Sequence, residues 1–371
     1  KIKEFELQNK RKTESTTEKK EQNQDYIIKE AEMIINNYCN KIENNQKKEK
    51  ILKIIIAILL ILILLGVGLT EVIGNYFVNY AIARSGAGGD RKISQESTIE
   101  VLGEDEKIIE NNKKIAKENS EKWSESIQQK QVEVKANDNI TLRGTEYLNQ
   151  EETNKWAIIL HGYRSNPSSV LTIGEHFSEK GYNVLIPSMR ACADSEGEYV
   201  GMGWLDKEDL KCWINLIIEE NKNAEIILHG SSMGAATVLM ASGDELPANV
   251  KNIIADSGYT SVWDIFASEA KARFNLPEFP VLNMFQIVAN RKAKYDIKEA
   301  SSLEQVKKSK TPILFIHGDK DDFVPEYMCE KLCDATNCKK EKIIIHGAGH
   351  TDGKYREPEK YYNTIFDWIS R

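Results

Sequence analysis

The hydrophobic pattern divides the chain into three regions of different character. Residues 1–50 are polar and densely charged, with few aromatic residues, and segments such as RKTESTTEKKEQNQ cannot bury a core. An almost unbroken apolar run follows, ILKIIIAILLILILLGVGLT, in which Lys53 carries the only charge. From about residue 131 onward, short apolar runs alternate with amphipathic stretches. The pattern therefore predicts a disordered or loosely helical segment, then a long apolar helix, then a folded domain.

The apolar run predicts a helix that crosses a membrane once, over residues 51–74. About 20 residues at a rise of 1.5 Å each span the roughly 30 Å hydrocarbon core of a bilayer. The alternatives are a buried helix of a soluble domain and a cleaved signal peptide. A soluble helix is seldom apolar on every face, and the long polar stretch before the run argues against a signal peptide.

The charges beside this run predict its orientation. On its carboxyl side no cation follows until Arg84, whereas lysines crowd its amino side: Lys41, Lys47, Lys48, Lys50 and Lys53. Because cytoplasmic flanks are enriched in lysine and arginine, residues 1–50 are expected in the cytoplasm. The folded domain is then extracytoplasmic, and the chain is a single-pass membrane protein. Tyr76, Phe77 and Tyr80 fit the aromatic belt at the outer lipid–water interface.

Residues 75–130 are expected to connect the membrane helix to the folded domain. The stretch SGAGGD at residues 85–90 has the composition of a flexible joint. Residues 104–129 are charged and carry a sparse apolar stripe, which favours a helical stalk or a first docking helix.

The pattern over residues 131–371 predicts an α/β domain with a mostly parallel sheet. VEVKANDNITLRGTEYL alternates apolar and polar residues around a turn, as a β-hairpin does. Later runs are β-branched and apolar on both faces, as strands covered by helices on both sides are. These runs are WAIILH (156–161), NVLIP (183–187), EIILH (225–229), NIIA (252–255), PILFIH (312–317) and KIIIH (342–346).

Composition narrows the classes of partner. A net charge of −7 gives no reason to expect nucleic acid. The six cysteines lack the paired spacing of a zinc site, and no metal or organic cofactor is predicted. They are expected to be free thiols, with a local disulfide near the chain end as the alternative; they are Cys39, Cys192, Cys212, Cys329, Cys333 and Cys338.

A serine stands where ligands bind in parallel α/β sheets, beyond the carboxyl end of a strand. Ser232 lies within GSSMG, between the apolar run EIILH and the helix-forming AATVLMA. A G-x-S-x-G turn presents its serine hydroxyl clear of the backbone, which makes Ser232 the candidate nucleophile. Gly230 and Gly234 are expected to remove side chains that would collide with the neighbouring elements.

A serine hydroxyl is a poor nucleophile near neutral pH and needs a base beside it. His350, in the loop after the last apolar run, is the candidate base, and His346 is the alternative. Asp321 is the candidate acid that orients the histidine; Asp319 and Asp322 are not excluded by chemistry alone.

Two backbone N–H groups are expected to bind the oxyanion. One comes from Met233, directly after the serine, and the other from Tyr163, in the loop after WAIILHG. The chain order Ser232, Asp321, His350 is the order found in the hydrolase fold.

With these motifs in place, residues 131–371 resemble the α/β-hydrolase superfamily. The matching stretches are HGYRSN (161–166), HGSSMGAAT (229–237), HGDKDDFVP (317–325) and GAGH (347–350). The region is similar to bacterial membrane-anchored serine hydrolases of the serine aminopeptidase and cinnamoyl-esterase-like groups. The resemblance implies that Asp321 is the acid of the H-G-x-x-D-x-x-V-P pattern. SMRACADSEG departs from the family's Asp-x-Arg-x-His-Gly-x-Ser, so the details of that loop do not transfer.

The sequence predicts a serine hydrolase that cleaves a small-molecule acyl substrate, an ester or a small amide, through an acyl-enzyme. A peptidase-type hydrolase and a catalytically inert membrane-tethered binding module are the alternatives. An insertion at about residues 260–310 either packs on the sheet or forms a small lid over an apolar pocket. Arg190 and Trp204 are further candidates for the border of the cleft.

Overall fold

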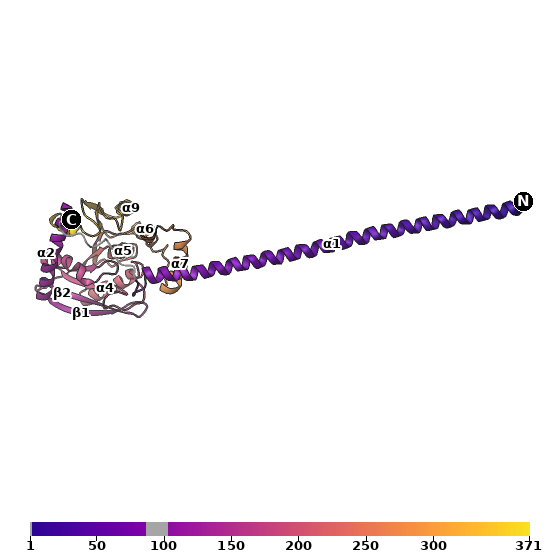
Figure 1. The fold of residues 1–371 in the computed structure, drawn as a ribbon. Coiled ribbons are helices and arrows are strands. Elements are labelled where there is room, and N and C mark those ends of the chain that lie inside the picture. Colours follow the sequence, from indigo (N-terminus) through magenta and orange to yellow (C-terminus); the bar gives the residue numbers. More distant parts are fainter. Residues whose placement is uncertain (1, 87–102) are drawn as a thin grey trace. The chain divides into compact units, whose positions relative to one another are not determined.

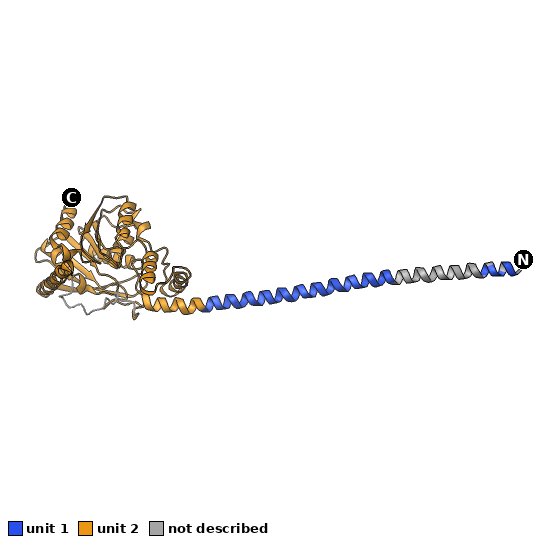
Figure 2. Cartoon of the chain, turned by 45° about the horizontal axis from the view of Figure 1, so that its top comes forward, with its two compact units in different colours: residues 1–68 blue, residues 69–371 orange. Residues whose placement is uncertain are grey.

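The computed structural model describes residues 2–86 and 103–371, with the backbone alone for most positions before residue 29. The chain forms two compact units, residues 1–68 and residues 69–371 (Figure 2). Most of the expected flexible joint at residues 85–90 lies outside the described residues.

One helix, α1 (Ile2–Ala81), contains the apolar run. Its side chains are exposed on every face over residues 51–69, and burial begins only at Thr70. Within the described part of the chain, α1 is the one helix long and apolar enough to cross a membrane. Its most apolar stretch is not buried at all, unlike the core helix of a soluble domain.

Eight strands of the described residues form one sheet, in the spatial order β1-β2-β4-β3-β5-β6-β7-β8. Figure 1 labels the first two, β1 and β2, which lie side by side. β1 and β2 pair antiparallel, as the predicted hairpin, and β2 also pairs antiparallel with β4. All other neighbours are parallel, which confirms a mostly parallel α/β sheet. The strands are β1 (Gln128–Lys135), β2 (Thr141–Leu148), β3 (Lys155–Leu160), β4 (Asn183–Pro187), β5 (Glu225–Ser231), β6 (Val250–Asp256), β7 (Ile313–Gly318) and β8 (Lys340–Ile345).

Helices cover both faces of the sheet because successive strand residues point to opposite sides. In β3, Ile158 and Leu160 join one core cluster while Ala157 and Ile159 join the other. The first cluster is closed by α4 (Asp206–Glu220), α5 (Met233–Ala241) and α9 (Tyr327–Ala335). The second is closed by α2 (Glu104–Ser126), α3 (Leu171–Glu179) and α11 (Pro358–Ser370). The short helices η2 (Pro167–Val170) and α10 (Gly353–Arg356) lie in connections.

The predicted insertion after β6 folds into three helices: α6 (Val262–Phe274), α7 (Val281–Ala293) and α8 (Ser302–Val306). The Ser261 side chain accepts a hydrogen bond from the backbone N–H of Asp264 and so caps the start of α6. Asn275, in a left-handed conformation with φ of 52°, ends α6. The two prolines that follow separate α6 from α7.

Candidate active site

The turn between β5 and α5 holds Ser232 in a strained conformation, with φ of 57° and ψ of −116°. A side chain at Gly230 would place its Cβ 2.1 Å from the carbonyl oxygen of Gly234. A side chain at Gly234 would place its Cβ 2.3 Å from the carbonyl oxygen of Leu160 in β3. Both glycines are therefore required for this turn to pack, as the sequence predicted.

Replacing Gly230 with alanine is expected to lower the free energy of unfolding by at least about 2 kcal/mol, because the new methyl group meets backbone that cannot rotate away. In thermal unfolding of the detergent-solubilised protein, the Tm should fall by about 4–8 °C. Gly353→Ala is the matched control, since its Cβ would lie 3.1 Å from the Cγ1 of Ile345, a side-chain atom rather than backbone. Equal shifts in the two variants would contradict the steric account.

The three candidate side chains lie in one chain of hydrogen bonds. The Oγ of Ser232 is 2.8 Å from the Nε2 of His350, and the Nδ1 of His350 is 2.7 Å from the Oδ2 of Asp321. The other carboxylate oxygen of Asp321 accepts the backbone N–H groups of Phe323 at 3.0 Å and Val324 at 2.8 Å. The fold thus brings together residues from the ends of three strands.

The alternatives to these residues lie elsewhere. The Nδ1 of His346 pairs with Asp319 at 2.9 Å, and the His346 side chain is 78% exposed. Asp322 is exposed as well. Of the candidate histidines and aspartates, His350 and Asp321 are the pair that the structure places next to Ser232.

Asp321 is buried, and its surroundings favour the charged carboxylate. Burial alone raises the pKa of Asp321, but hydrogen bonds from His317 and His350 outweigh it and lower the pKa to about 2. The Nε2 of His317 lies 3.3 Å from the Oδ2 of Asp321. Sequence reasoning missed His317, although its position four residues before the aspartate was a visible signal. Asp321 therefore stays ionised at neutral pH, where it can orient an imidazole and stabilise an imidazolium.

The loop after β3 lies against Ser232. A Cβ at Gly162 would be 3.4 Å from the Cβ of Ser232, so the loop passes close to the serine at this residue. Tyr163 is the next residue in the loop. His161 holds this loop: its Nδ1 lies 2.9 Å from the carbonyl oxygen of Gly162, and its Nε2 accepts the backbone N–H of Met189 at 3.1 Å. These contacts need a neutral ring, and burial lowers the pKa of His161 to about 4.

Stability should fall on acidification because two buried histidines resist protonation. Burial lowers the pKa to about 4 for His161 and to about 3 for His229, against about 6.5 in the unfolded chain. Below pH 6.5 the unfolded state binds protons that the folded state does not, so stability rises with pH in this window. Each histidine should contribute a slope that approaches about 1.4 kcal/mol per pH unit near pH 5, between its folded and unfolded pKa values.

Denaturant unfolding of wild type and His229→Gln across pH 4 to 7 measures this slope. The variant should lose about half of the histidine contribution. Parallel curves for the two proteins would show that His229 does not carry it.

The end of α1 is bonded to the same loop. The hydroxyl of Tyr163 donates to the carbonyl oxygen of Ala81. The guanidinium of Arg164 donates to the carbonyl oxygens of Ala83 at 2.7 Å and Gly86 at 2.6 Å. The segment from Ala81 to Gly86, which the sequence assigned to a linker, therefore supports the loop expected to bind the oxyanion.

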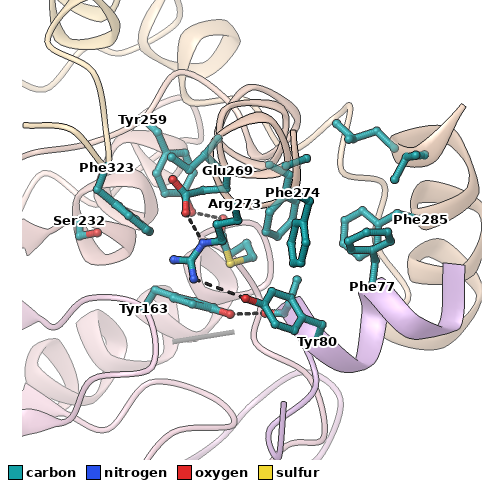
Figure 3. Close-up of a pocket in the computed structure, with 17 residues that line it drawn as sticks. Phe77, Tyr80, Tyr163, Ser232, Tyr259, Glu269, Arg273, Phe274, Phe285 and Phe323 are labelled. Carbon is teal, nitrogen blue, oxygen red and sulfur yellow. Dashed lines mark hydrogen bonds and ion pairs between the residues drawn. The ribbon is translucent and has the colours of Figure 1, made fainter. Parts of the chain in front are cut away.

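Ser232 lies at one end of an apolar pocket with a volume of about 80 Å³ (Figure 3). The pocket walls come from the end of α1, from the insertion helices α6 and α7, and from Phe323. The ring of Phe323 is 5.0 Å from that of His350. Among the lining residues are Phe77, Tyr80, Ile265, Phe266, Phe274 and Phe285.

Arg190 and Trp204 do not line this pocket, so the suggestion that they border it was wrong. Arg190 is buried behind the site and holds both carboxylate oxygens of Asp209, at 2.7 and 2.6 Å. The ammonium nitrogen of Lys207 lies over the ring of Trp204, 4.4 Å from the ring centre, in a cation–π contact. All six cysteines are free thiols, which excludes the local disulfide in this structure.

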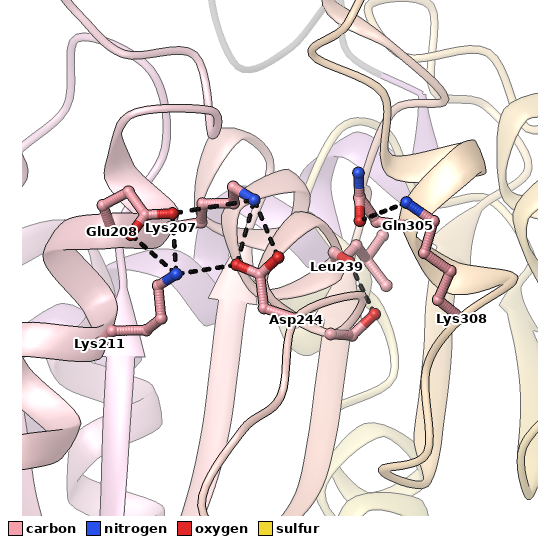
Figure 4. Close-up of polar contacts among 8 residues, drawn as sticks. Lys207, Glu208, Lys211, Leu239, Asp244, Gln305 and Lys308 are labelled. Atoms are coloured by element: carbon pink, nitrogen blue, oxygen red, sulfur yellow. Dashed lines mark hydrogen bonds and ion pairs between the residues drawn. The ribbon is translucent and has the colours of Figure 1, made fainter.

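An ionic network connects the end of α5, the helix that starts after Ser232, to the neighbouring helix α4. Asp244, just beyond the end of α5, accepts from Lys207 at 3.1 Å and Lys211 at 2.9 Å, both on α4 (Figure 4). Lys211 also pairs with Glu208 at 2.7 Å. Every residue of α5 is buried, so these contacts tie the buried helix to its neighbour.

Known proteins share this fold. Residues 156–277 match the family described as the alpha/beta hydrolase fold. The uncharacterized protein YqkD of Bacillus subtilis is 27% identical over 219 residues, 59% of this chain and 72% of the relative. The uncharacterized membrane protein YNL320W of Saccharomyces cerevisiae is 23% identical over 249 residues, 66% of this chain and 81% of the relative.

Two solved structures resemble the same region. The Pyrococcus furiosus esterase Pf2001 aligns with a TM-score of 0.53 at 23% identity, over 66% of this chain and 91% of that one. A Pyrococcus horikoshii acylaminoacyl peptidase aligns with a TM-score of 0.51 at 17% identity, over 66% of this chain and 41% of that one. At these identities the likeness shows the fold alone.

A mostly parallel eight-stranded sheet with a serine turn after β5 defines the class of protein. The chain has the alpha/beta hydrolase fold, and residues 156–277 match the family model of that description.

Proposed function

We propose that the protein is a serine hydrolase that cleaves an ester, or less favourably a small amide, through an acyl-enzyme. The observation that carries the proposal is the chain of hydrogen bonds from Ser232 through His350 to Asp321, at 2.8 and 2.7 Å. Supporting it is the placement of Ser232 at the end of an apolar pocket, where an acyl group can lie beside the hydroxyl.

The reaction has two halves. His350 takes the proton of Ser232 as its oxygen attacks the acyl carbon, and the N–H groups of Tyr163 and Met233 hold the oxyanion. His350 then gives that proton to the leaving oxygen or nitrogen, which departs as an alcohol or amine. In the second half His350 takes a proton from water, whose oxygen attacks the acyl-enzyme. Release of the carboxylic acid restores the serine.

An esterase fits the pocket better than a peptidase. The charged groups in the pocket wall are Glu269 and Arg273, which pair with each other at 2.5 Å. A peptide backbone would have to lie against a mostly aromatic and aliphatic wall without partners for its polar groups. The fold likeness to an acylaminoacyl peptidase keeps a peptidase-type hydrolase as the second candidate.

A fluorophosphonate probe tests the proposal directly, because it reacts with an activated serine. The full-length protein in detergent should be labelled, and pretreatment with the probe should abolish hydrolysis of a p-nitrophenyl ester. A correctly folded protein that is neither labelled nor active would instead be the inert binding module.

We also propose that α1 anchors the protein in a membrane, with residues 1–50 in the cytoplasm and the hydrolase domain outside. The fully exposed apolar residues 51–69 span about 28 Å at 1.5 Å each. Lysines precede this stretch, and a relative is named as a membrane protein. Protease added to intact cells should degrade the hydrolase domain. Its protection until the cells are lysed would reverse the orientation.

A further inference from the structure

The pocket beside Ser232 has one wall from α1 and one from the insertion. The ring of Phe274, at the end of α6, packs edge-on against Phe77 at 5.6 Å and Tyr80 at 5.4 Å between ring centres. Gly74 lets α7 approach α1 closely, because a Cβ there would be 2.4 Å from a methyl group of Val288. These contacts make the end of α1 part of the pocket (Figure 3).

An ion pair extends the same contact toward the apolar run. The two terminal guanidinium nitrogens of Arg291, on α7, donate to the two carboxylate oxygens of Glu71, at 2.6 and 2.7 Å. Glu71 comes two residues after Leu69, the last residue of the fully exposed stretch. Phe77 is eight residues after Leu69, or about 12 Å along the helix. Along α1, the pocket wall therefore begins within about 12 Å of the proposed lipid-facing stretch.

The insertion exposes large apolar side chains, and the charges around them are of both signs, since Glu278 is exposed beside Phe279. Among described residues from 103 onward, six large hydrophobic side chains are exposed, and half of them belong to this insertion: Phe274 at 37%, Phe279 at 76% and Ile287 at 56%. Lys271 and Lys294 are exposed beside them. Exposed aromatic and aliphatic side chains next to lysines are the composition of a surface that rests on lipid headgroups.

From these observations we propose that the substrate is an acyl ester embedded in the membrane surface. Its hydrocarbon chain passes over the exposed side chains of the insertion and enters the pocket that Phe77 and Phe274 line, which brings its carbonyl to Ser232. The inference names the substrate class of the proposed serine hydrolase and rests on that function.

The pocket's size and lining support this class. Each methylene group that leaves water contributes about 0.8 kcal/mol, and the pocket walls are mostly aromatic and aliphatic. The cavity volume of about 80 Å³ exceeds the roughly 10–15 Å³ that one water needs. The cavity can therefore hold the start of an acyl chain, while the remainder of a long chain stays against Phe279 and Ile287 or in the bilayer.

The test uses the full-length protein in phosphatidylcholine vesicles and two esters with one leaving group, 4-methylumbelliferyl butyrate and 4-methylumbelliferyl oleate. The butyrate is delivered from water and the oleate from the vesicle. The variant Phe279→Ser/Ile287→Ser removes apolar contacts outside the pocket and the hydrogen-bonded residues of the site. It should lower kcat/KM for the oleate about tenfold and leave the butyrate unchanged.

Two matched variants complete the test. Phe279→Leu/Ile287→Leu keeps an apolar surface and should retain activity on the oleate. Ile115→Ser, on α2, removes a side chain of similar exposure, 49%, away from the insertion and should change neither rate.

Failure of the inference is distinguishable from failure of the proposed function. If the butyrate is cleaved and the serine double variant affects both esters equally or neither, the hydrolase stands and membrane delivery is overturned. If neither ester is cleaved and the fluorophosphonate probe does not label the protein, the serine hydrolase itself is overturned, and the inference with it.

Discussion

Replacing Ser232 with alanine should lower kcat on a soluble ester by about 10⁵- to 10⁶-fold, the loss typical when a serine nucleophile is removed. The hydroxyl forms the acyl bond, and it is the group that hydrogen-bonds to the Nε2 of His350, at 2.8 Å. The oxyanion donors are backbone groups and remain, so a small rate above that of water should persist. Initial rates with p-nitrophenyl butyrate, together with loss of fluorophosphonate labelling, measure the effect.

The neighbouring serine provides the matched control. The hydroxyl of Ser231 is buried and has no hydrogen-bond partner among the residues described. Ser231→Ala should therefore retain activity within a few-fold and unfold at the same temperature. Loss of activity in both variants would indicate damage to the turn, and retained activity in Ser232→Ala would remove the serine from the mechanism.

Replacing Asp321 with asparagine should lower kcat by about 10⁴-fold at neutral pH. The carboxylate accepts from the Nδ1 of His350 at 2.7 Å, which leaves Nε2 free to take the serine proton. An amide can present its NH₂ group instead, which favours the opposite tautomer and removes the charge that stabilises an imidazolium. Rates with the same soluble ester across pH 5 to 9 measure the change.

Asp319→Asn is the control for this variant, because Asp319 pairs with the exposed His346 instead. It should change kcat by less than a few-fold. In the wild type the pKa of Asp321 is about 2, so this carboxylate stays charged from pH 5 to 9. If Asp319→Asn were as inactive as Asp321→Asn, the assignment of Asp321 as the acid that orients His350 would be contradicted.

Local patterns in the sequence determined much of this structure. Each strand of the sheet coincides with a predicted apolar run or hairpin arm, because residues buried on both faces must be apolar whatever their neighbours are. The turn at Ser232 was equally readable, since only glycine fits where a Cβ would lie 2.1 to 2.3 Å from backbone oxygens. The apolar stretch at residues 51–69 is set by composition alone.

Only the tertiary structure placed the end of α1 in the site. The hydrogen bond from Tyr163 to Ala81 joins residues 82 positions apart, and the contacts of Arg164 with the same segment are as distant. A fragment beginning after residue 100 would lack this pocket wall and the support of the loop at Tyr163. The role of His317 beside Asp321 also emerged only from the folded chain.

The sequence by itself determined the strands, the serine turn and the apolar helix, because each depends on residues close together in the chain. The tertiary structure alone decided which side chains surround Ser232 and what kind of pocket they make. His350 lies 118 positions from that serine, and Phe77 and Phe274 come from α1 and α6, which are far apart in the sequence. Such contacts depend on how whole helices pack, and no short stretch of sequence records that packing.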